Sequence, residues 1–186
     1  DVTEFMRLYR AHPVVTIAEV RGYCVAGGTD LMLASDIALT SDDAQLGVPN
    51  VRGLGITMML PVWSWMVGPQ RAKLLALTGD FITGAEAAQF GLVAASMPGT
   101  ILSDRVVAIA ERIALMPEEL LHVTKQALNA AWDAAGLGTT LLRAAELDAI
   151  SHGTDPVIGF WDEVERDGMR AALQSRDHSF SDTRIL

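Results

Sequence analysis

The sequence has 186 residues, of which 50% are hydrophobic and 20% are charged. This composition excludes a disordered chain, because such chains lack the apolar side chains that offset the entropy lost on ordering. The length predicts a single globular domain. Fourteen Lys and Arg against 23 Asp and Glu give a net charge of -9. That balance argues against nucleic-acid binding, which requires basic side chains to neutralise phosphates.

Other simple features narrow the class of protein further. No apolar run approaches the ~20 residues of a membrane span, and no basic segment followed by an apolar one predicts a signal peptide. The single cysteine, Cys24, suits a reducing compartment, so we expect a cytoplasmic protein. The four histidines are scattered without a metal-binding spacing such as H-E-x-x-H, and we expect no metal site.

Short apolar and β-branched runs separated by glycine are typical of the first hundred residues. In chain order they predict a helix over 4–11, a strand over 14–20, a glycine-containing loop over 21–29, a short helix over 30–35, and strands over 36–40 and 44–46. A helix over 70–77 follows. The next helix begins at Thr83, where Thr83 and Glu86 form a capping box, and it ends before Gly91. Residues 92–96 return as a strand.

The remaining sequence predicts almost continuous helix. We expect helices over 104–115 with Ser103 as the cap, from Pro117 to about residue 134, over 139–151, and from Asp155 onward with a break near Gly159 or Gly168. Pro117 stands where a helix-starting proline is favoured, and the two glutamates after it suit the helix dipole.

Several of these segments carry a distinctive pattern of residues. The segments are G-Y-C-V-A-G-G-T-D-L over 22–31, D-I-A over 36–38, L-G-V-P over 46–49, L-T-G over 77–79, I-T-G-A-E-A over 82–87 and F-G-L-V over 90–93. In this order they resemble the crotonase superfamily, the enoyl-CoA hydratases and isomerases. The run from Asp167 to Ala171, with Arg176 and Phe180, is similar to the end of the family's chains.

The resemblance implies an α/β fold of the ClpP/crotonase type, a spiral of β-β-α turns with a C-terminal helical trimerisation region. Residues 1–102 would form the C-terminal portion of the spiral core and residues 103–186 the helical trimerisation region. It also implies a further segment of about 70 to 80 residues before Asp1. That segment would supply the first strands, part of the surface that binds coenzyme A and one of two oxyanion-hole amides.

The resemblance assigns catalytic roles to two residues. Gly27 aligns with a backbone N–H donor that stabilises a thioester enolate, and a glycine lets a ligand approach the backbone closely. The alternative is a tight strand-to-helix turn that merely needs glycine. Asp30 aligns with a carboxylate that handles protons or holds water. Its alternative is an aspartate that only stabilises the start of a helix.

The residue after the Gly-x-Pro turn departs from the family pattern. The hydratases have a second glutamate there, whereas this sequence has Asn50, whose amide cannot shuttle protons. We expect substrate contacts from Cys24, Val25 and Ala26 beside Gly27, and from Asn50 and Arg52. For Arg52 the alternative is a surface or subunit-interface residue. Cys24 is interpreted as a small packing residue rather than a nucleophile.

Together these features predict an acyl-CoA-processing enzyme, an enoyl-CoA hydratase or isomerase, with Asp30 as the single candidate acid or base. The alternatives are an acyl-CoA decarboxylase or hydrolase, with Asn50 or Arg52 orienting the substrate, and an inactive homologue that only binds acyl-CoA. Coenzyme A would enter as part of the substrate, and no other cofactor is expected. The resemblance further implies a homotrimer or a dimer of trimers.

Overall fold

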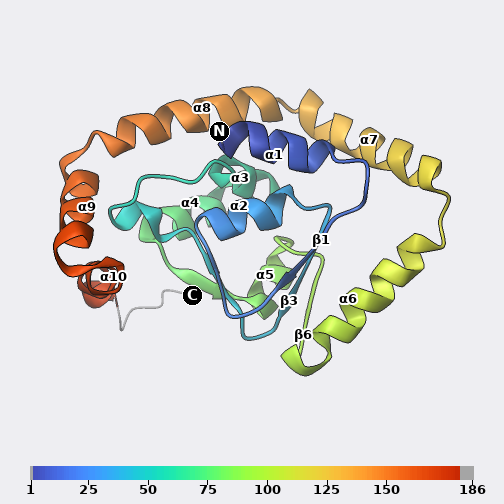
Figure 1. The fold of residues 1–186 in the computed structure, drawn as a ribbon, viewed down its shortest axis with the longest axis horizontal. Coiled ribbons are helices and arrows are strands. Elements are labelled where there is room, and N and C mark those ends of the chain that lie inside the picture. The colour runs from blue at the N-terminus through green and yellow to red at the C-terminus, as the bar shows by residue number, and fades with distance from the viewer. Residues whose placement is uncertain (1, 181–186) are drawn as a thin grey trace.

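Two small β-sheets and the helices packed on them form the centre of the molecule, and an arc of long helices surrounds them (Figure 1). The structure, a computed structural model, describes residues 2–180. The chain begins with α1 on the outer side of this centre, enters the sheets, and leaves through the arc formed by α6 to α10.

The elements of the central part alternate between short strands and helices. They are α1 (Val2–Ala11), β1 (Ile17–Val20), β2 (Tyr23–Val25), α2 (Gly27–Ala34), β3 (Ile37–Ser41), β4 (Gln45–Gly47), the 3-10 helix η1 (Pro49–Arg52), α3 (Leu60–Val67), α4 (Pro69–Thr78), β5 (Phe81–Thr83), α5 (Gly84–Phe90) and β6 (Ala95–Met97). The helices of the arc are α6 (Gly99–Ala114), α7 (Glu118–Ala134), α8 (Leu137–His152), α9 (Asp155–Asp167) and α10 (Met169–Asp177), followed by the 3-10 helix η2 (His178–Phe180).

The strands pair in two sheets. One has the order β1-β3-β6 with parallel pairing, and the other has the order β2-β4-β5, in which β2 and β4 are parallel and β4 and β5 antiparallel. Leu46 of β4 pairs with Ile82 of β5, and both side chains are fully buried. Trp63 and Met59 are also buried and belong to the same hydrophobic cluster. The core therefore lies between the second sheet and α3.

The structure confirms most of the predicted elements. The capping box of α5 is present, with Thr83 as N-cap, and Gly91 ends the helix in the left-handed conformation. α7 begins directly after Pro117, and the break in the last helical segment falls at Gly168 rather than Gly159. These ends are set by local side-chain and backbone chemistry, which sequence alone reveals.

Other predictions were wrong in detail. The expected loop over 21–29 contains β2 and the first turn of α2, and α3 and β5 had not been predicted. α6 begins at Gly99 after Pro98 as N-cap, so Ser103 lies inside the helix and its hydroxyl bonds Glu19 instead. β2 and β5 have three residues each, too few to show an alternation of apolar and polar side chains. They form because each pairs with the neighbouring strand β4.

The long helices are tied to the core by specific polar contacts. Lys125 of α7 donates to the Asp36 carboxylate at 2.7 Å and to the carbonyl of Val14 at 3.0 Å, beside the starts of β1 and β3. α8 packs on α1 and on α3. The predicted helical region over 103–186 is helical through most of its described part, and its residues 181–186 lie outside the described residues.

Candidate active site

A cavity of about 430 Å³ lies where α1, α2, η1, the loop before α3, and α8 meet. Three of the residues singled out in the sequence line it together, namely Gly27, Asp30 and Asn50. The other predicted site residues, Cys24, Val25, Ala26 and Arg52, do not line this cavity. The loop before α3 closes one side with Ile56, Thr57 and Met58.

Gly27 lines the cavity at the start of α2. It is the first residue of α2, where helix geometry leaves the N–H groups without a carbonyl partner. Within residues 2–180 the N–H groups of Gly27 and Gly28 reach no acceptor, and a Cβ placed on Gly27 would meet open space. Ala26 makes this turn with φ 52° and ψ −121°, a conformation that L-residues rarely adopt. The backbone is thus held with a donor free for a ligand.

Asp30 is fixed in place by the start of the next helix. Its Oδ2 atom accepts from the N–H of Met58 and its Oδ1 atom from the N–H of Met59, each at 3.0 Å. These N–H groups belong to the turn that leads into α3, so the carboxylate satisfies donors that would otherwise be unpaired. Asp30 is only 3% exposed, and it still lines the cavity. Each carboxylate oxygen retains a further lone pair for a ligand.

The surroundings of Asp30 favour its protonated form. Burial raises the pKa of the Asp30 carboxyl above its ordinary value of 3.8, and the negative charge of Asp148 acts in the same direction. The Met59 N–H, the Thr57 hydroxyl and the Met58 N–H oppose this rise of the pKa without cancelling it. No described residue forms a salt bridge with Asp30. A buried carboxyl with a raised pKa and no cationic partner is a candidate for proton transfer.

Asn50 lies in η1, at the position where the family pattern has its second glutamate. Its backbone carbonyl accepts from the N–H groups of Gly53 and Leu54, which fixes the turn. Its side-chain Oδ1 is buried and has no hydrogen-bond partner among the described residues. Because the residue lines the cavity, this amide is available to bind a ligand there.

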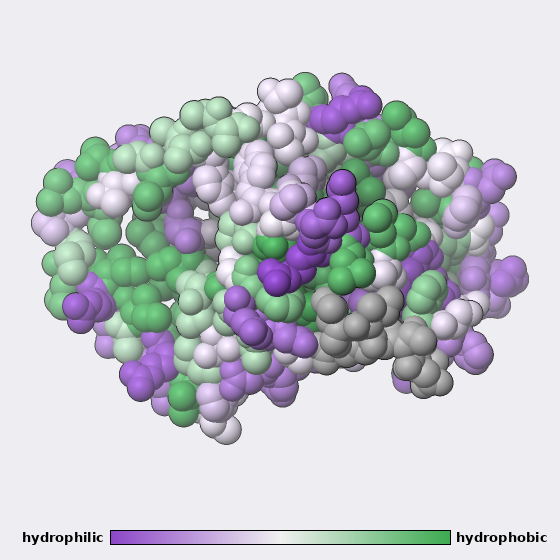
Figure 2. Space-filling model, turned by 180° about the vertical axis from the view of Figure 1, so that it is seen from behind, coloured by the Kyte–Doolittle hydropathy of each residue, from purple (hydrophilic) through white to green (hydrophobic). Residues whose placement is uncertain are grey.

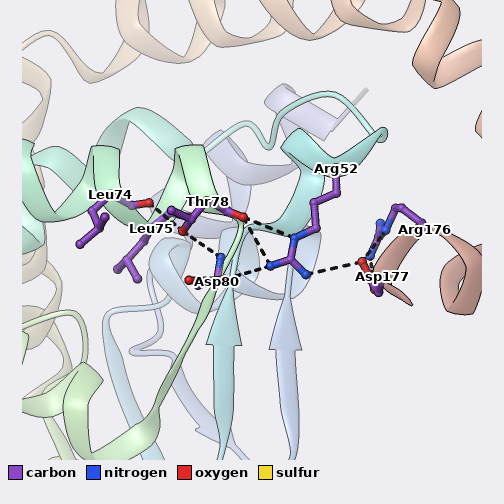
Figure 3. Close-up of polar contacts among 7 residues, drawn as sticks. All are labelled: Arg52, Leu74, Leu75, Thr78, Asp80, Arg176 and Asp177. Carbon is purple, nitrogen blue, oxygen red and sulfur yellow. Dashed lines mark hydrogen bonds and ion pairs between the residues drawn. The ribbon is translucent and has the colours of Figure 1, made fainter. Parts of the chain in front are cut away.

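Arg52 does not line the cavity, and its guanidinium lies in a cluster of charged side chains (Figure 3). Its Nη2 lies 3.1 Å from Oδ1 of Asp80, and its Nη1 lies 3.6 Å from Oδ1 of Asp177 in α10. The guanidinium also stacks 4.0 Å above the ring of Phe180. With 5% of the side chain exposed, Arg52 joins η1 to the end of α10.

Residues 24–26 lie in β2 and in the turn that precedes Gly27. Cys24 is buried in β2, and burial raises the pKa of its thiol to about 11, so the sulfur is not a thiolate at neutral pH. Val25 pairs with Gly47 of β4, and the N–H of Ala26 donates to the Gly47 carbonyl. These contacts fix the position of the turn that carries Gly27.

Among the polar residues of the cavity that sequence reasoning missed are Asp148 and His152 of α8. They follow Leu141 and Ala144, which are buried, at helical spacing. A stripe that faces the core and becomes polar at its end was the available signal. Asp148 and His152 approach within 3.6 Å, and the ring Nδ1 lies 2.8 Å from the Asp148 backbone carbonyl.

A second cavity, of about 760 Å³, runs between α3, α4 and α8 and shares Ile56 with the first. Its walls are largely apolar, with Leu60, Ala76 and Leu147 among the lining residues. Such a surface suits a hydrocarbon chain better than a charged group.

Neither metal ligation nor a membrane span is indicated by the described residues. Over 2–180, no three His, Cys, Asp or Glu side chains gather in a way that would hold a metal ion. None of the helices in this part of the chain combines the length and the apolarity needed to cross a bilayer.

Comparison with known proteins gives consistent matches. Residues 1–155 match the model of the enoyl-CoA hydratase/isomerase family. A crotonyl-CoA hydratase of Syntrophomonas wolfei is 32% identical over 180 residues, which cover 94% of this chain and 64% of that protein. A mitochondrial enoyl-CoA hydratase of Pongo abelii is 30% identical, with 89% of this chain and 55% of that protein covered.

Solved structures give the same result. An enoyl-CoA hydratase from Mycobacterium smegmatis superposes with a TM-score of 0.90 at 35% identity, covering 97% of this chain and 63% of that one. An enoyl-CoA hydratase/isomerase from Xanthobacter autotrophicus superposes with a TM-score of 0.86 at 36% identity, with 96% and 67% covered. The chain spans under two thirds of the length of the curated relatives it matches.

Proposed function

Because the chain belongs to the enoyl-CoA hydratase/isomerase family, we propose that the complete protein binds an acyl-CoA thioester in the cavity at Asp30 and stabilises its enolate. The observation that carries the proposal is the pairing of a free backbone donor with a carboxyl that has no cationic partner. Gly27 and Asp30 line one cavity. In this proposal the Gly27 N–H donates to the thioester oxygen, and the Asp30 carboxyl transfers the proton at the neighbouring carbon.

The Gly27 N–H supplies electrostatic stabilisation. When a proton leaves the carbon next to the thioester, the electron pair moves toward oxygen, and a fixed donor stabilises the charge that develops there. The position of Gly27 at the start of α2 adds the positive end of the helix dipole. An oxyanion hole uses two donors, and we assign the second to a part of the complete protein outside this chain.

Asp30 supplies proton transfer. For isomerisation, a single carboxylate removes a proton from C2 of a 3-enoyl thioester and returns it to C4, which leaves the double bond between C2 and C3. The fixed position of the carboxylate between two N–H groups suits such a transfer, because reacting groups must be placed accurately. Hydration needs in addition a group that activates water.

A protein that only binds acyl-CoA is the second candidate. This candidate is favoured by the two hydrogen bonds that the Asp30 carboxylate accepts from backbone N–H groups. These bonds give Asp30 a structural role at the start of α3. A decarboxylase or hydrolase that orients a substrate carboxylate through Arg52 finds less support. That guanidinium is already occupied by Asp80 and Asp177.

Product analysis separates these candidates. The complete protein is incubated with 2-enoyl, 3-enoyl and saturated acyl-CoAs, and the products are followed by chromatography and mass spectrometry. We expect a gain of one water on a 2-enoyl-CoA, or a changed retention time at constant mass on a 3-enoyl-CoA. Binding of the thioesters without conversion would overturn the enzymatic proposal and support the binding protein.

We also propose that copies of the protein associate into a homotrimer or a dimer of trimers. Figure 2 shows hydrophobic residues gathered on the side of the molecule where α6 and α7 lie. The side chains of Leu115, Leu120 and Leu128 are 81%, 60% and 69% exposed. Apolar faces of this extent are usually covered by a partner. Light scattering on the complete protein should give three or six times the monomer mass, and a monomer would contradict the proposal.

A further inference from the structure

Asp148 of α8 lines the same cavity as Asp30. The two carboxylates come from distant parts of the chain, and their charges interact, because Asp148 contributes to the raised pKa of Asp30. Asn50, which replaces the family's second glutamate, also lines this space but offers only an amide. The cavity therefore contains a second carboxylate, although residue 50 does not supply it.

The position of Asp148 is fixed by the loop before α3. Its Oδ1 accepts from the N–H of Ile56 at 3.2 Å, while Oδ2 has no hydrogen-bond partner among the described residues. Gly55, with φ +90°, packs so closely on this part of α8 that a Cβ there would lie 2.9 Å from the Asp148 Oδ1. The side chain of Asp148 is 21% exposed, so the free oxygen is within reach of water.

The chemistry of hydration calls for two groups with opposite roles. One must accept a proton from water while its oxygen bonds to C3, and the other must give a proton to C2. An amide can do neither, so Asn50 leaves one role open. This step rests on the proposed function, since it concerns the same acyl-CoA site.

We propose that Asp148 is the second proton-transfer residue of this site, acting as the base for water while Asp30 is the acid at C2. The Asp148 carboxylate takes a proton from water, and the oxygen of that water forms the bond to C3. The electron pair of the C2–C3 double bond moves toward the thioester, and the Asp30 carboxyl gives its proton to C2. A proton then passes from Asp148 to solvent and from solvent to Asp30, which restores both groups.

The different surroundings of the two carboxyls support this division of roles. Asp30 is 3% exposed, and burial favours its protonated form, as an acid requires. Asp148 is partly exposed to water and has an oxygen free to accept a proton. Two carboxyls whose environments differ in this way are suited to opposite roles in one reaction.

The variant Asp148→Asn separates a catalytic role from a structural one. An asparagine still offers an oxygen to the Ile56 N–H, so the loop before α3 keeps its contact, whereas the amide cannot take a proton. Asp148→Glu restores a carboxylate one methylene further out. Glu146→Gln is the matched control, because Glu146 lies on the same helix but pairs with the exposed Arg143.

Two reactions are measured on the complete protein and each variant. The first is hydration of 2-butenoyl-CoA, and the second is exchange of the C2 protons of butanoyl-CoA for deuterium, which needs Asp30 but no water activation. We expect Asp148→Asn to lower the hydration rate at least ~100-fold and to leave exchange close to that of the unsubstituted protein. Asp148→Glu should recover part of the hydration, and Glu146→Gln should change neither reaction.

Four results would overturn the proposal. Unchanged hydration by Asp148→Asn would assign Asp148 a structural role, and loss of hydration by His152→Gln under the same conditions would move the role of base to that histidine. An unsubstituted protein that exchanges protons but hydrates nothing would overturn this proposal while leaving the proposed function intact. Absence of both reactions would overturn the proposed function together with it.

Discussion

The cavity at Asp30 and the cluster around Arg52 place buried carboxylates in opposite environments. Both include residues of η1, because Asn50 faces the cavity and Arg52, two residues later, lies in the cluster (Figure 3). In the cluster, Asp80 contacts a guanidinium at 3.1 Å. In the cavity, Asp30 accepts from backbone N–H groups at 3.0 Å and forms no salt bridge with a described residue.

This difference explains what each region can do. A carboxylate beside a cation holds elements together through an ion pair, whereas burial without a cation raises the pKa of the Asp30 carboxyl. The cluster therefore joins η1 to α10, and the cavity retains a carboxyl without a cationic partner among the described residues. Arg52 therefore stabilises the fold through its ion pairs with Asp80 and Asp177, and it places no positive charge in the cavity.

The largest effect should follow from breaking the cluster. Arg52→Met leaves Asp80 buried without its cation, and we expect the free energy of unfolding to fall by about 3 to 5 kcal/mol. Chemical denaturation measures this change. The double variant with Asp80→Asn should recover much of the loss, and equal stability of the single and double variants would show that the pair has no energetic role.

Asp30 should make a smaller contribution to the free energy of unfolding, and this contribution should depend on pH in a definite direction. Because its pKa is raised in the folded protein, its carboxyl contributes stability that is fully present below about 3.8 and is lost as pH rises through the folded-state pKa. Relative to Asp30→Asn, the unsubstituted protein should lose up to about 1.4 kcal/mol per pH unit in that window. Denaturation at a series of pH values tests it, and an opposite slope would contradict the environment described for Asp30.

The turn beside the cavity should respond to a single methyl group. Ala26 has φ 52°, which glycine adopts without strain, so Ala26→Gly should raise the free energy of unfolding by about 1 kcal/mol. Thermal unfolding would show a higher midpoint. A lower midpoint would mean that the flexibility gained by the unfolded chain outweighs the strain released.

The smallest change in the free energy of unfolding should follow from breaking an exposed ion pair. Arg143 and Glu146 approach within 2.8 Å, but their side chains are 62% and 53% exposed. Arg143→Ala should therefore change the free energy of unfolding by less than about 0.5 kcal/mol. A loss as large as that of Arg52→Met would mean that burial does not distinguish the two pairs.

The sequence predicted those features that depend on neighbouring residues. Thr83 and Glu86 predicted the start of α5, and Pro117 the start of α7. The motif around Gly27 and Asp30 predicted two residues that the structure brings to one cavity. In each case the signal and the structure it determines lie within a few residues of each other.

The features that escaped prediction depend on distant contacts. α3 was missed because Pro61 and Ser64 interrupt the apolar run from which it forms, and burial of Trp63 in the core compensates for that. Asp148 reaches Ile56 across 92 positions, and Arg52 reaches Asp80 across 28. No local pattern specifies such partners, because the fold has to be known before they meet.

The central claim is that Asp30 and the Gly27 N–H form and stabilise a thioester enolate. Its most direct test is the exchange of the C2 protons of butanoyl-CoA for deuterium, measured by mass spectrometry on the complete protein and on Asp30→Asn, with binding of the thioester measured in parallel. We predict exchange by the unsubstituted protein and a loss of at least ~100-fold in the variant, with binding retained. Equal exchange by both proteins, or binding without exchange by the unsubstituted protein, would contradict the account.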